Sequence, residues 1–484
     1  MRLAVKHEKQ QPVIRADFSG GLNTVGVVEG IEENQLAVAI NLEVEHATGK
    51  LRTVSGTRDV FQLKKEELFA VVYDEINKAM LIVRDDRRVF LVDFEGRAKP
   101  LTLGKLTGKL YPKYEAWDRG VLIASGGQLQ YFNGEKLQIL DTPPAEEVKV
   151  RGGRVMIAHG RRLFYSGVGD ENDWLIDNNS ASSSKWLEIG YKDGARIVGL
   201  ASLANEVLIL KSNQRAYRLQ GEFDEWQLIE VGRAIGCKTR RSQCVVGDEV
   251  FVLNWFDAHF IQEGIYGTAR PENIGLLVSS ELERLPPETQ ARFLPSLNQV
   301  WLIGGTESVL IYDVVLKSWW KRKFNAEVRD AFGAGKEVYV VKRDRISVLD
   351  SDSFLDNGKA MEWKMVGQRL VSHHDFLLKR TKVLVTPLNE AEYLGEITAG
   401  KVKVPLPCKT RRPKSPIYQT RLKLASESKN RGREMPQSEE RAISKDTYSV
   451  ESRNVYRKYY LDIEGRGKAV GFILHSITLD IAEV

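Results

Sequence analysis

The chain has 484 residues, of which 42% are hydrophobic and 28% are charged, and its formal net charge at pH 7 is +6. The composition is ordinary for a folded globular protein and excludes global disorder, while the length exceeds what one ordinary hydrophobic core needs. No apolar run approaches the roughly 18–20 residues of a membrane helix, and the mild positive charge permits contact with nucleic acid without requiring it.

The N-terminus carries no sign of export, because MRLAVKHEKQQPVIRADF lacks the apolar core and small-residue cleavage site of a secretory signal. Cys237, Cys244 and Cys408 are too few and too scattered for a disulfide framework. Cys237 and Cys244, which have six residues between them and no paired Cys or His nearby, do not match a zinc pattern. We expect free thiols, no metal, no cofactor and synthesis in a reducing cytoplasm.

Residues 1–64 form the first predicted segment, which contains DFSGGLNT (Asp17–Thr24). Its glycine pair can take positive φ angles or lie close against a neighbour, and Phe18 and Leu22 supply flanking apolar anchors. Two interpretations stay open. The segment contributes to an interface with another subunit, or it only closes the following domain as an N-terminal strand.

Alternation of apolar and polar residues dominates from about residue 68 to about residue 354 and predicts β-strands. The strands are joined by tight turns such as Gly126-Gly127 and Asn133-Gly134, which readily adopt the positive φ angles that hairpins need. Seven strand–turn–strand units recur, namely Met80–Gly96, Val121–Leu140, Val155–Gly167, Val207–Glu222, Val250–Gly264, Val300–Trp320 and Val338–Asp352.

Units that recur roughly every 30–50 residues, each with two to four short strands, are typical of a β-propeller rather than a sandwich. We predict an all-β protein in which residues 65–358 form a seven-bladed propeller, with six or eight blades as alternatives because two units are irregular. One large residue in the second strand of each unit is expected to pack between blades: Phe90, Tyr131, Phe164, Tyr217, Phe260, Tyr312 and Ile346.

The segment RLFYSGVGDENDW (Arg162–Trp174) begins as a strand and continues as an acidic loop that ends in tryptophan. It admits three interpretations: a calcium loop, the lip of an active site, or a structural turn. A calcium loop needs oxygen ligands at alternate positions and a closing bidentate acid, which GDENDW does not supply. The sequence favours a structural turn in which Trp174 folds the loop back over the edge of a blade.

Helical periodicity is best at Ser279–Leu285, a predicted short insertion on one face of the propeller. Residues 359–484 are predicted to form a small C-terminal β domain with a long basic loop, ending in the strands RKYYLDIEGRG and AVGFILHSITLDIAEV. The loop could clamp nucleic acid phosphates, although a solvated linker or an interface arm is the commoner outcome for such a run. Its basic residues are Lys409, Arg411, Arg412 and Lys414.

Common catalytic signatures are missing: the sequence has no GxSxG elbow, P-loop, HExxH motif or dinucleotide-binding GxGxxG. His373 and His374 are adjacent, so on a strand they would point to opposite faces and not share a metal. The repeated boxes of propeller sialidases are missing too, although paired carboxylates for glycoside cleavage stay open. We predict that the chain is not an enzyme.

The segments Asp17–Thr24 and Ile31–Val60 resemble the opening of bacteriophage tail proteins, the stabilisation or nozzle proteins of short-tailed phages and the tail tubular protein B group. Those chains begin with Phe-x-Gly-Gly-Leu/Ile-Asn, then carry an Asn-Gln and Ala-x-Asn segment and a glycine-bounded turn. Val54-Ser55 stands where the family often has Arg-Pro. The matching residues are Asn34, Gln35, Ala39, Asn41, Gly49, Leu51, Arg52 and Gly56.

Later segments resemble the same family in the same order. They are Arg162–Trp174, with Arg161 where asparagine is common, the stretch Ala234–Gly264, and the two closing strands. The resemblance implies a virion structural protein of the phage tail, made in the host bacterial cytoplasm. It would be a nozzle or hub component that forms part of the conduit for genome ejection.

The family also implies partners. They are a homo-oligomeric ring, most often a hexamer, and the adaptor or head-completion protein below the portal, with tail fibre or spike proteins as further candidates. DNA would pass through the channel without sequence-specific binding, and no membrane is implied. The basic loop is expected outside the lumen, because repeated phosphate contacts would arrest the DNA. The expected partner-binding residues are Phe18, Gly20, Gly21, Leu22, Asn23, Lys409, Arg411, Arg412 and Lys414.

Two other functions stay open on the sequence alone. One is a non-viral β-propeller that binds a protein or a glycan. The other is a propeller glycoside hydrolase, which would lose turnover when one carboxylate is replaced.

Overall fold

The computed structural model describes residues 10–63, 66–92, 100–176, 183–203, 206–221, 225–263, 269–371, 376–388, 393–407, 446–456, 460–468 and 471–483. Strands dominate these ranges, so the predicted all-β class is confirmed. The helical segments found in them are η2 (Leu276–Val278), α1 (Ser279–Glu283) and η3 (Pro295–Leu297). The first two agree with the short helical insertion predicted at Ser279–Leu285. No helix in this part of the chain is long and apolar enough to span a membrane.

The chain divides into two compact units. Unit 1 comprises residues 1–57, 312–325 and 350–484, and unit 2 comprises residues 58–311 and 326–349. The predicted division into 1–64, 65–358 and 359–484 differs from these units in residues 58–64, 312–325 and 350–358. The three-segment division stays a prediction about folding domains.

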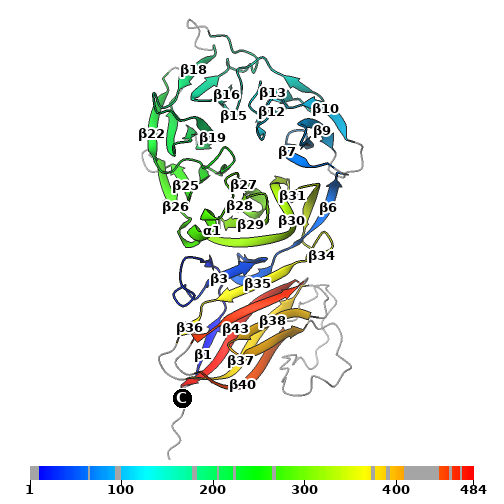
Figure 1. Ribbon diagram of the computed structural model, residues 1–484, viewed down its shortest axis with the longest axis vertical. Coiled ribbons are helices and arrows are strands. Elements are labelled where there is room, and N and C mark those ends of the chain that lie inside the picture. The colour runs from blue at the N-terminus through cyan, green and yellow to red at the C-terminus, as the bar shows by residue number, and fades with distance from the viewer. Residues whose placement is uncertain are drawn as a thin grey trace, which may run out of the picture. The chain divides into compact units, whose positions relative to one another are not determined.

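Unit 2 is a β-propeller, in which four-stranded antiparallel sheets follow one another around a common centre (Figure 1). Consecutive strands of the chain are neighbours in each sheet, as hairpin connections require. Five sheets are separate: β7 (Leu68–Asp74), β8 (Ala79–Arg84), β9 (Arg88–Val92), β10 (Leu101–Lys105); β11 (Lys113–Trp117), β12 (Gly120–Ala124), β13 (Gln130–Phe132), β14 (Leu137–Ile139); β15 (Glu147–Arg151), β16 (Arg154–His159), β17 (Arg162–Tyr165), β18 (Lys185–Glu188); β19 (Ile197–Leu203), β20 (Glu206–Lys211), β21 (Arg215–Gln220), β22 (Gln227–Arg233); β23 (Gln243–Val246), β24 (Glu249–Leu253), β25 (Ala258–Glu263), β26 (Ala269–Asn273).

The remaining strands of unit 2 belong to a fifteen-stranded sheet. In it β27 pairs with β28, β28 with β29 and β29 with β30, while β30 continues through β31 and β32 to β6. The strand β6 comes from the N-terminal part of the chain, so it lies beside strands that follow it by almost 300 positions. The blade number of seven stays a prediction. The strand bounds are β6 (Gly56–Gln62), β27 (Gln290–Leu294), β28 (Gln299–Ile303), β29 (Thr306–Asp313), β30 (Ser318–Ala334), β31 (Glu337–Lys342) and β32 (Arg345–Asp350).

Hydrophobic cores lie between neighbouring sheets and continue around the ring. Separate clusters join β7–β9 to β12 and β13, then β12 and β13 to β15 and β16, β16 and β17 to β19–β21, and β19–β21 to β24 and β25. A further cluster joins β7–β9 to β30–β32, which connects the beginning of the propeller to its end. Strands between two cores bury both faces, which explains why Met80–Val83 reads as a continuous apolar run.

The residues expected to pack between blades are almost all buried. Phe90 and Ile346 share one inter-sheet cluster, and Tyr131 and Phe164 share another. Tyr217 belongs to the cluster between β16–β17 and β19–β21. Phe260 and Tyr312 are also buried, at 3% exposure each, against Phe251 and Trp319 respectively.

The acidic loop after β17 folds back on itself, as a structural turn does. Gly167 donates its backbone N–H to the carbonyl oxygen of Asp173 at 2.9 Å. Trp174 Nε1 donates to the carbonyl oxygen of Glu171 at 2.7 Å, and Trp174 packs against the cluster between the β12 and β16 sheets. The interpretation in which Trp174 returns over the blade is confirmed.

In unit 1, strands from segments far apart in the chain lie side by side. A six-stranded sheet has the order β4-β5-β43-β37-β40, with β1 also on β43, and β2, β3, β33–β35, β38, β39 and β42 belong to the fifteen-stranded sheet. The bounds are β1 (Gln10–Arg15), β2 (Gly21–Leu22), β3 (Gln35–Ile40), β4 (Leu42–Glu45), β5 (Lys50–Thr53), β33 (Leu355–Asp356), β34 (Lys359–Ala360), β35 (Glu362–Gly367), β36 (Leu370–Val371), β37 (Phe376–Pro387), β38 (Tyr393–Ala399), β39 (Val402–Pro407), β40 (Asp446–Tyr456), β41 (Tyr460–Leu461), β42 (Ile463–Lys468) and β43 (Phe472–Glu483).

The two closing strands predicted from the sequence are present as β42 and β43. They do not pair with each other: β42 lies between β35 and β38, and β43 lies between β37 and β5. Each therefore has long-range partners on both sides, which sequence proximity does not reveal.

Candidate functional site

Charged side chains gather where the first strands of the propeller sheets meet. The first strands β11, β15, β19, β23 and β27 contact one another in sequence around the centre. These strands, β30 and the loops beside them carry a connected set of polar residues, here called the axial network: Tyr111, Lys113, Glu147, Arg240, Arg241, Gln290, Arg292 and Asp330.

Asp330 on β30 is the centre of one half of the axial network and is only 1% exposed. Arg292 Nε and Nη2 donate to its two carboxylate oxygens at 2.8 and 2.9 Å. Gln290 Nε2 and Tyr111 Oη each donate to it at 2.5 Å. Burial alone would raise the pKa of Asp330, but the charges of Arg292 and Arg241 and the hydrogen bonds from Arg292 and Tyr111 together hold this pKa below its usual value. Asp330 is therefore a fixed negative charge at neutral pH.

The other half of the axial network is formed by Arg240, Glu147 and Lys113. Arg240 Nε donates to Glu147 Oε1 at 2.8 Å, and Arg240 Nη1 donates to the carbonyl oxygen of Tyr111 at 3.4 Å. Arg240 Nη2 is buried and has no hydrogen-bond partner among the described residues. Burial lowers the pKa of Lys113 to about 8 in spite of Glu147, and burial raises the pKa of Glu147.

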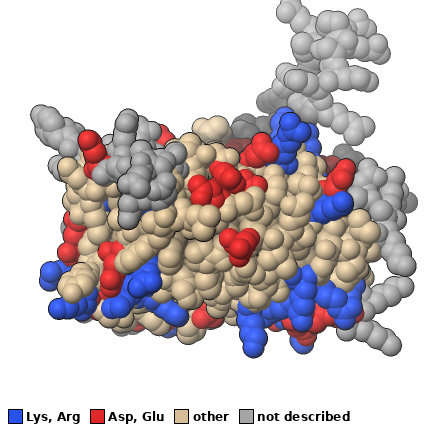
Figure 2. Space-filling view, turned by 90° about the horizontal axis from the view of Figure 1, so that it is seen from above, with Lys and Arg blue, Asp and Glu red and all other residues tan. Residues whose placement is uncertain are grey.

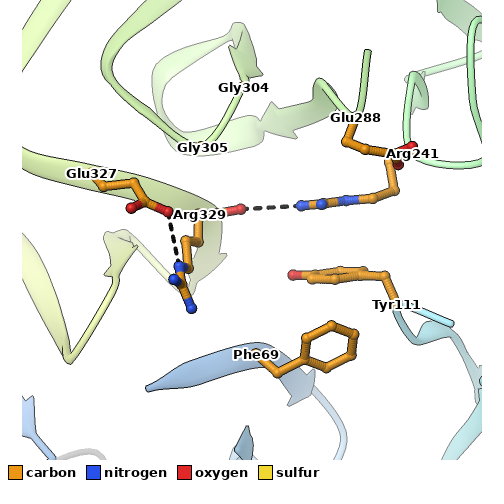
Figure 3. A pocket seen from close by; sticks show the side chains of 8 residues that line it. All are labelled: Phe69, Tyr111, Arg241, Glu288, Gly304, Gly305, Glu327 and Arg329. Carbon is orange, nitrogen blue, oxygen red and sulfur yellow. Dashed lines mark hydrogen bonds and ion pairs between the residues drawn. The ribbon is translucent and has the colours of Figure 1, made fainter. Parts of the chain in front are cut away.

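A cavity of about 230 Å³ adjoins the axial network, and we call it the axial pocket (Figure 3). The rings of Phe69 and Tyr111 form one wall, with centroids 5.5 Å apart. The guanidinium of Arg241 stacks on the Tyr111 ring at 3.8 Å from its centroid. The pocket is lined by Phe69, Tyr111, Arg241, Glu288, Gly304, Gly305, Glu327 and Arg329.

The two arginines of the axial pocket differ in the groups that accept hydrogen bonds from them and compensate their charge. Arg329 pairs with Glu67 at 2.7 Å and with Glu327 at 3.0 Å. Arg241 instead donates to Gln290 Oε1, and its Nη2 donates to the carbonyl oxygen of Arg329 at 3.1 Å (Figure 3). Arg241 is thus held in place by neutral acceptors and by an aromatic ring, and Asp330 influences it only at longer range.

The size and chemistry of the pocket limit what it can hold. Ligand pockets for drug-sized molecules range from about 300 to 1,000 Å³, and the axial pocket is smaller, at about 230 Å³. Its aromatic wall suits a short apolar stem, while the Arg241 guanidinium suits a planar acceptor. Within the described part of the chain, no group of three or more His, Cys, Asp or Glu residues is arranged to hold a metal ion.

The charges on the outer surface are arranged less specifically. Figure 2 shows one face of the molecule, on which Lys and Arg gather mainly along one edge while Asp and Glu are scattered. Neither sign forms a continuous patch among the coloured residues of this view, whereas nucleic-acid-binding surfaces concentrate positive charge.

The partner-binding residues expected from the sequence lie elsewhere. Phe18 and Leu22 are buried in unit 1, each at 3% exposure, and Asn23 is also buried. A side chain on Gly20 would meet Asn34, and Gly21 has a φ of +64° beside Trp319. Their role at an interface stays a prediction. Lys409, Arg411, Arg412, Lys414 and the pair His373-His374 lie outside the described residues.

The sequence did not reveal the axial network, because its residues are spread from Tyr111 to Asp330. No pattern marks these residues in the sequence, because Glu147 and Asp330 lie in strands that carry other charged residues as well, EVKVR and SWWKRKFNAEVRDAFGA. Cys237 and Cys244 are free, as expected, and burial raises the pKa of both thiols. Cys408 lies outside the described residues.

No protein-family model matches the chain, and no curated protein matches it. Among solved structures, BamB from Moraxella catarrhalis is 8% identical and covers 62% of this chain and 90% of its own, with a TM-score of 0.40. The β-propeller domain of Cps50 (Swd1) from Myceliophteria thermophila is 9% identical, covers 61% and 100%, and has a TM-score of 0.44. The structure titled YCF48 bound to D1 peptide is 10% identical, covers 61% and 97%, and has a TM-score of 0.40. At these values the likenesses carry no functional argument, and the fold assignment rests on the sheets described above.

Proposed function

We propose that this chain is a β-propeller binding module that takes a segment of a protein partner at the axial pocket. The observation that carries the proposal is the pairing of an aromatic wall, Phe69 and Tyr111, with the stacked guanidinium of Arg241. Aromatic residues and arginine are the residue types that contribute most to protein interfaces. A rigid propeller presents such a group without the cost of ordering a loop.

The arrangement of the pocket favours binding over catalysis. Tyr111 is fixed at both ends, because its hydroxyl donates to Asp330 at 2.5 Å and its ring lies under Arg241. Burial raises the pKa of Tyr111, so its hydroxyl stays protonated and acts as a donor rather than a base. These groups therefore supply fixed recognition contacts. The absence of enzymatic activity remains a prediction.

The proposal is tested by selecting binders from a random peptide library on the purified chain. We expect peptides whose affinity falls at least tenfold with Phe69→Ala, because this change removes half of the aromatic wall. Arg233→Ala is the matched control, since Arg233 is 74% exposed and pairs with Glu230 on the outer strand β22. Selected peptides that bind Phe69→Ala as tightly as the parent chain would show that recognition occurs outside the axial pocket. A library that yields no binders would contradict the proposal.

The resemblance to phage tail proteins supports a second candidate, a virion structural protein of a tail nozzle ring. The residues that carry this resemblance have structural roles in unit 1. Asn41 bonds to β30, to β35 and to the backbone of Val54, while Gly49 and Gly56 lie where a side chain would meet Asp17 and the backbone of Leu355. The matching pattern therefore corresponds to a folded element rather than to scattered identities.

This second candidate predicts a hexamer that binds an adaptor protein and surrounds DNA. Mass photometry of the purified chain, with and without the adaptor encoded nearby, tests the ring. Mass spectrometry of purified virions tests the location. A monomer that never enters particles, encoded among housekeeping genes, would contradict the candidate while leaving the binding module intact.

A further inference from the structure

The axial network has more positive than negative side chains. Lys113, Arg240, Arg241 and Arg292 are coupled to the carboxylates of Glu147 and Asp330. Neighbouring charges are already compensated. Glu115 pairs with Lys149 at 2.5 Å, and Glu146 faces His159 and Arg196. A partly buried excess of positive charge is unfavourable until an anion approaches it.

Two arginine nitrogens of this network are ready to donate. Arg240 Nη2 is buried without a partner among the described residues, and Arg240 lies directly against the backbone of Tyr111. Arg241 uses its Nε and Nη2 for Gln290 and Arg329, whereas its Nη1 has no hydrogen bond to any residue that the structure describes. A buried cationic donor without an acceptor is costly, so an acceptor supplied by a ligand would bind favourably.

The walls of the pocket favour a singly charged group on an apolar stem. Arg241 covers one face of the Tyr111 ring and Arg87 lies over the Phe69 ring at 3.2 Å from its centroid, so the rings form an apolar wall beside guanidinium groups. Two acids also line the pocket: Glu288, which is exposed, and Glu327, which pairs with Arg329. A phosphate dianion would be repelled by these acids more strongly than a carboxylate.

We propose that the axial pocket recognises the carboxylate of an aspartate or glutamate side chain on a protein partner, seated on Arg241 against Tyr111. This inference rests on the proposed function and specifies its ligand. The acidic side chain approaches the axis, its methylene groups contact Phe69 and Tyr111, and its carboxylate accepts from Arg241 Nη1.

The test uses the full-length chain and two capped amino acids, N-acetylglutamate amide and N-acetylglutamine amide, titrated while NMR signals of the tryptophan indoles and arginine side chains are recorded. We expect saturable shifts with the glutamate probe and at least tenfold weaker binding of the glutamine probe, because only the former brings a charge to Arg241. Inorganic phosphate is a third probe, and it should bind more weakly than the glutamate probe. Equal or stronger binding of phosphate, or no difference between glutamate and glutamine, would overturn the proposal.

A second measurement separates this inference from the proposed function. In peptides selected on the chain, replacement of one acidic residue by its amide should weaken binding at least tenfold, and Arg241→Gln should remove that difference. Arg241→Lys, which keeps the charge but loses the planar fork, should give intermediate affinity. Arg233→Gln is the surface control. Peptides that bind at the pocket without any preference for acidic residues would contradict the proposed carboxylate recognition. They would still support the proposed function as a binding module.

Discussion

At the scale of single residues, Asn41 connects segments of unit 1 that lie far apart in the chain. Its φ is +55°, a conformation that asparagine tolerates better than most residues. Its Nδ2 donates to the carbonyl oxygen of Glu362 at 2.7 Å, and its Oδ1 accepts from the backbone N–H of Lys323 at 2.7 Å. One side chain therefore connects β3 to β30 and β35 within unit 1.

We predict that Asn41→Ala lowers the free energy of unfolding of unit 1 by about 3 kcal/mol, because the partly buried backbone groups of Glu362 and Lys323 lose their partners at about 1–3 kcal/mol each. Chemical denaturation followed by hydrogen exchange of unit 1 peptides measures the loss. Asn133→Ala is the control, since Asn133 also accepts two backbone N–H groups but in an exposed turn. Equal losses for both variants would refute the role given to Asn41.

A buried ion pair gives unit 2 a defined pH dependence. Lys211 is fully buried, and its Nζ donates to Asp193 Oδ2 at 2.6 Å and to Oδ1 at 2.7 Å. Burial alone would raise the pKa of Asp193, but the hydrogen bonds from Lys211 lower it below its usual value. A lowered carboxylate pKa adds stability above the unfolded pKa, and this stability is lost as pH falls through the folded pKa.

We predict that Asp193→Asn destabilises unit 2 by about 3–5 kcal/mol at pH 7, because it leaves the Lys211 ammonium buried without its counter-charge. The difference between parent and variant should shrink as pH falls from about 4 towards 2. Thermal denaturation across this range measures it. Asp86→Asn, in an exposed pair with Arg88, is expected to change little. A difference that persists unchanged at low pH would contradict the assignment.

At the scale of elements, the predicted units capture the middle strands of the propeller sheets, while most first and last strands lie outside them; β14, within Val121–Leu140, is an exception. All seven predicted units contain the two middle strands of a propeller sheet or their equivalents, such as β8 and β9 in Met80–Gly96. Those strands are buried on both faces and read as apolar runs. Outer strands such as β10, with a mostly exposed pattern, carry no such signal. The axial network escaped prediction because its partners meet only after the sheets have formed a ring.

The geometry of the hairpin between β12 and β13 supports a prediction at this scale. A side chain on Gly120, at the start of β12, would collide with the backbone of Phe132 on β13, whereas a side chain on Gly152 would meet open space. Gly120→Ala should therefore cost about 3 kcal/mol or more, because the strand pair must separate. Gly152→Ala should cost about 1 kcal/mol, since only the φ of +56° is strained. Thermal denaturation of the two variants measures both losses of stability. A larger loss for Gly152→Ala than for Gly120→Ala would contradict the prediction.

At the scale of the whole molecule, the division into two units predicts which strands a destabilising substitution affects. Asn41 belongs to unit 1 and Gly120 belongs to unit 2, and the inter-sheet cores of the propeller lie within unit 2. Residues of β6 and of β30 are shared between the units, so the backbone connects them at more than one point. Either the units unfold separately, or these shared strands make them one cooperative system.

We predict separate unfolding, because each unit has its own buried strands, and substitutions without shared partners add within about 0.5 kcal/mol. Asn41→Ala should speed hydrogen exchange in β37 and β43 and leave β11–β13 unchanged, while Gly120→Ala should do the reverse. The double variant should show both effects at their single-variant sizes. Faster exchange in β37 and β43 after Gly120→Ala alone would show instead that β6 and β30 couple the stability of the two units. The chain would then unfold as one cooperative system.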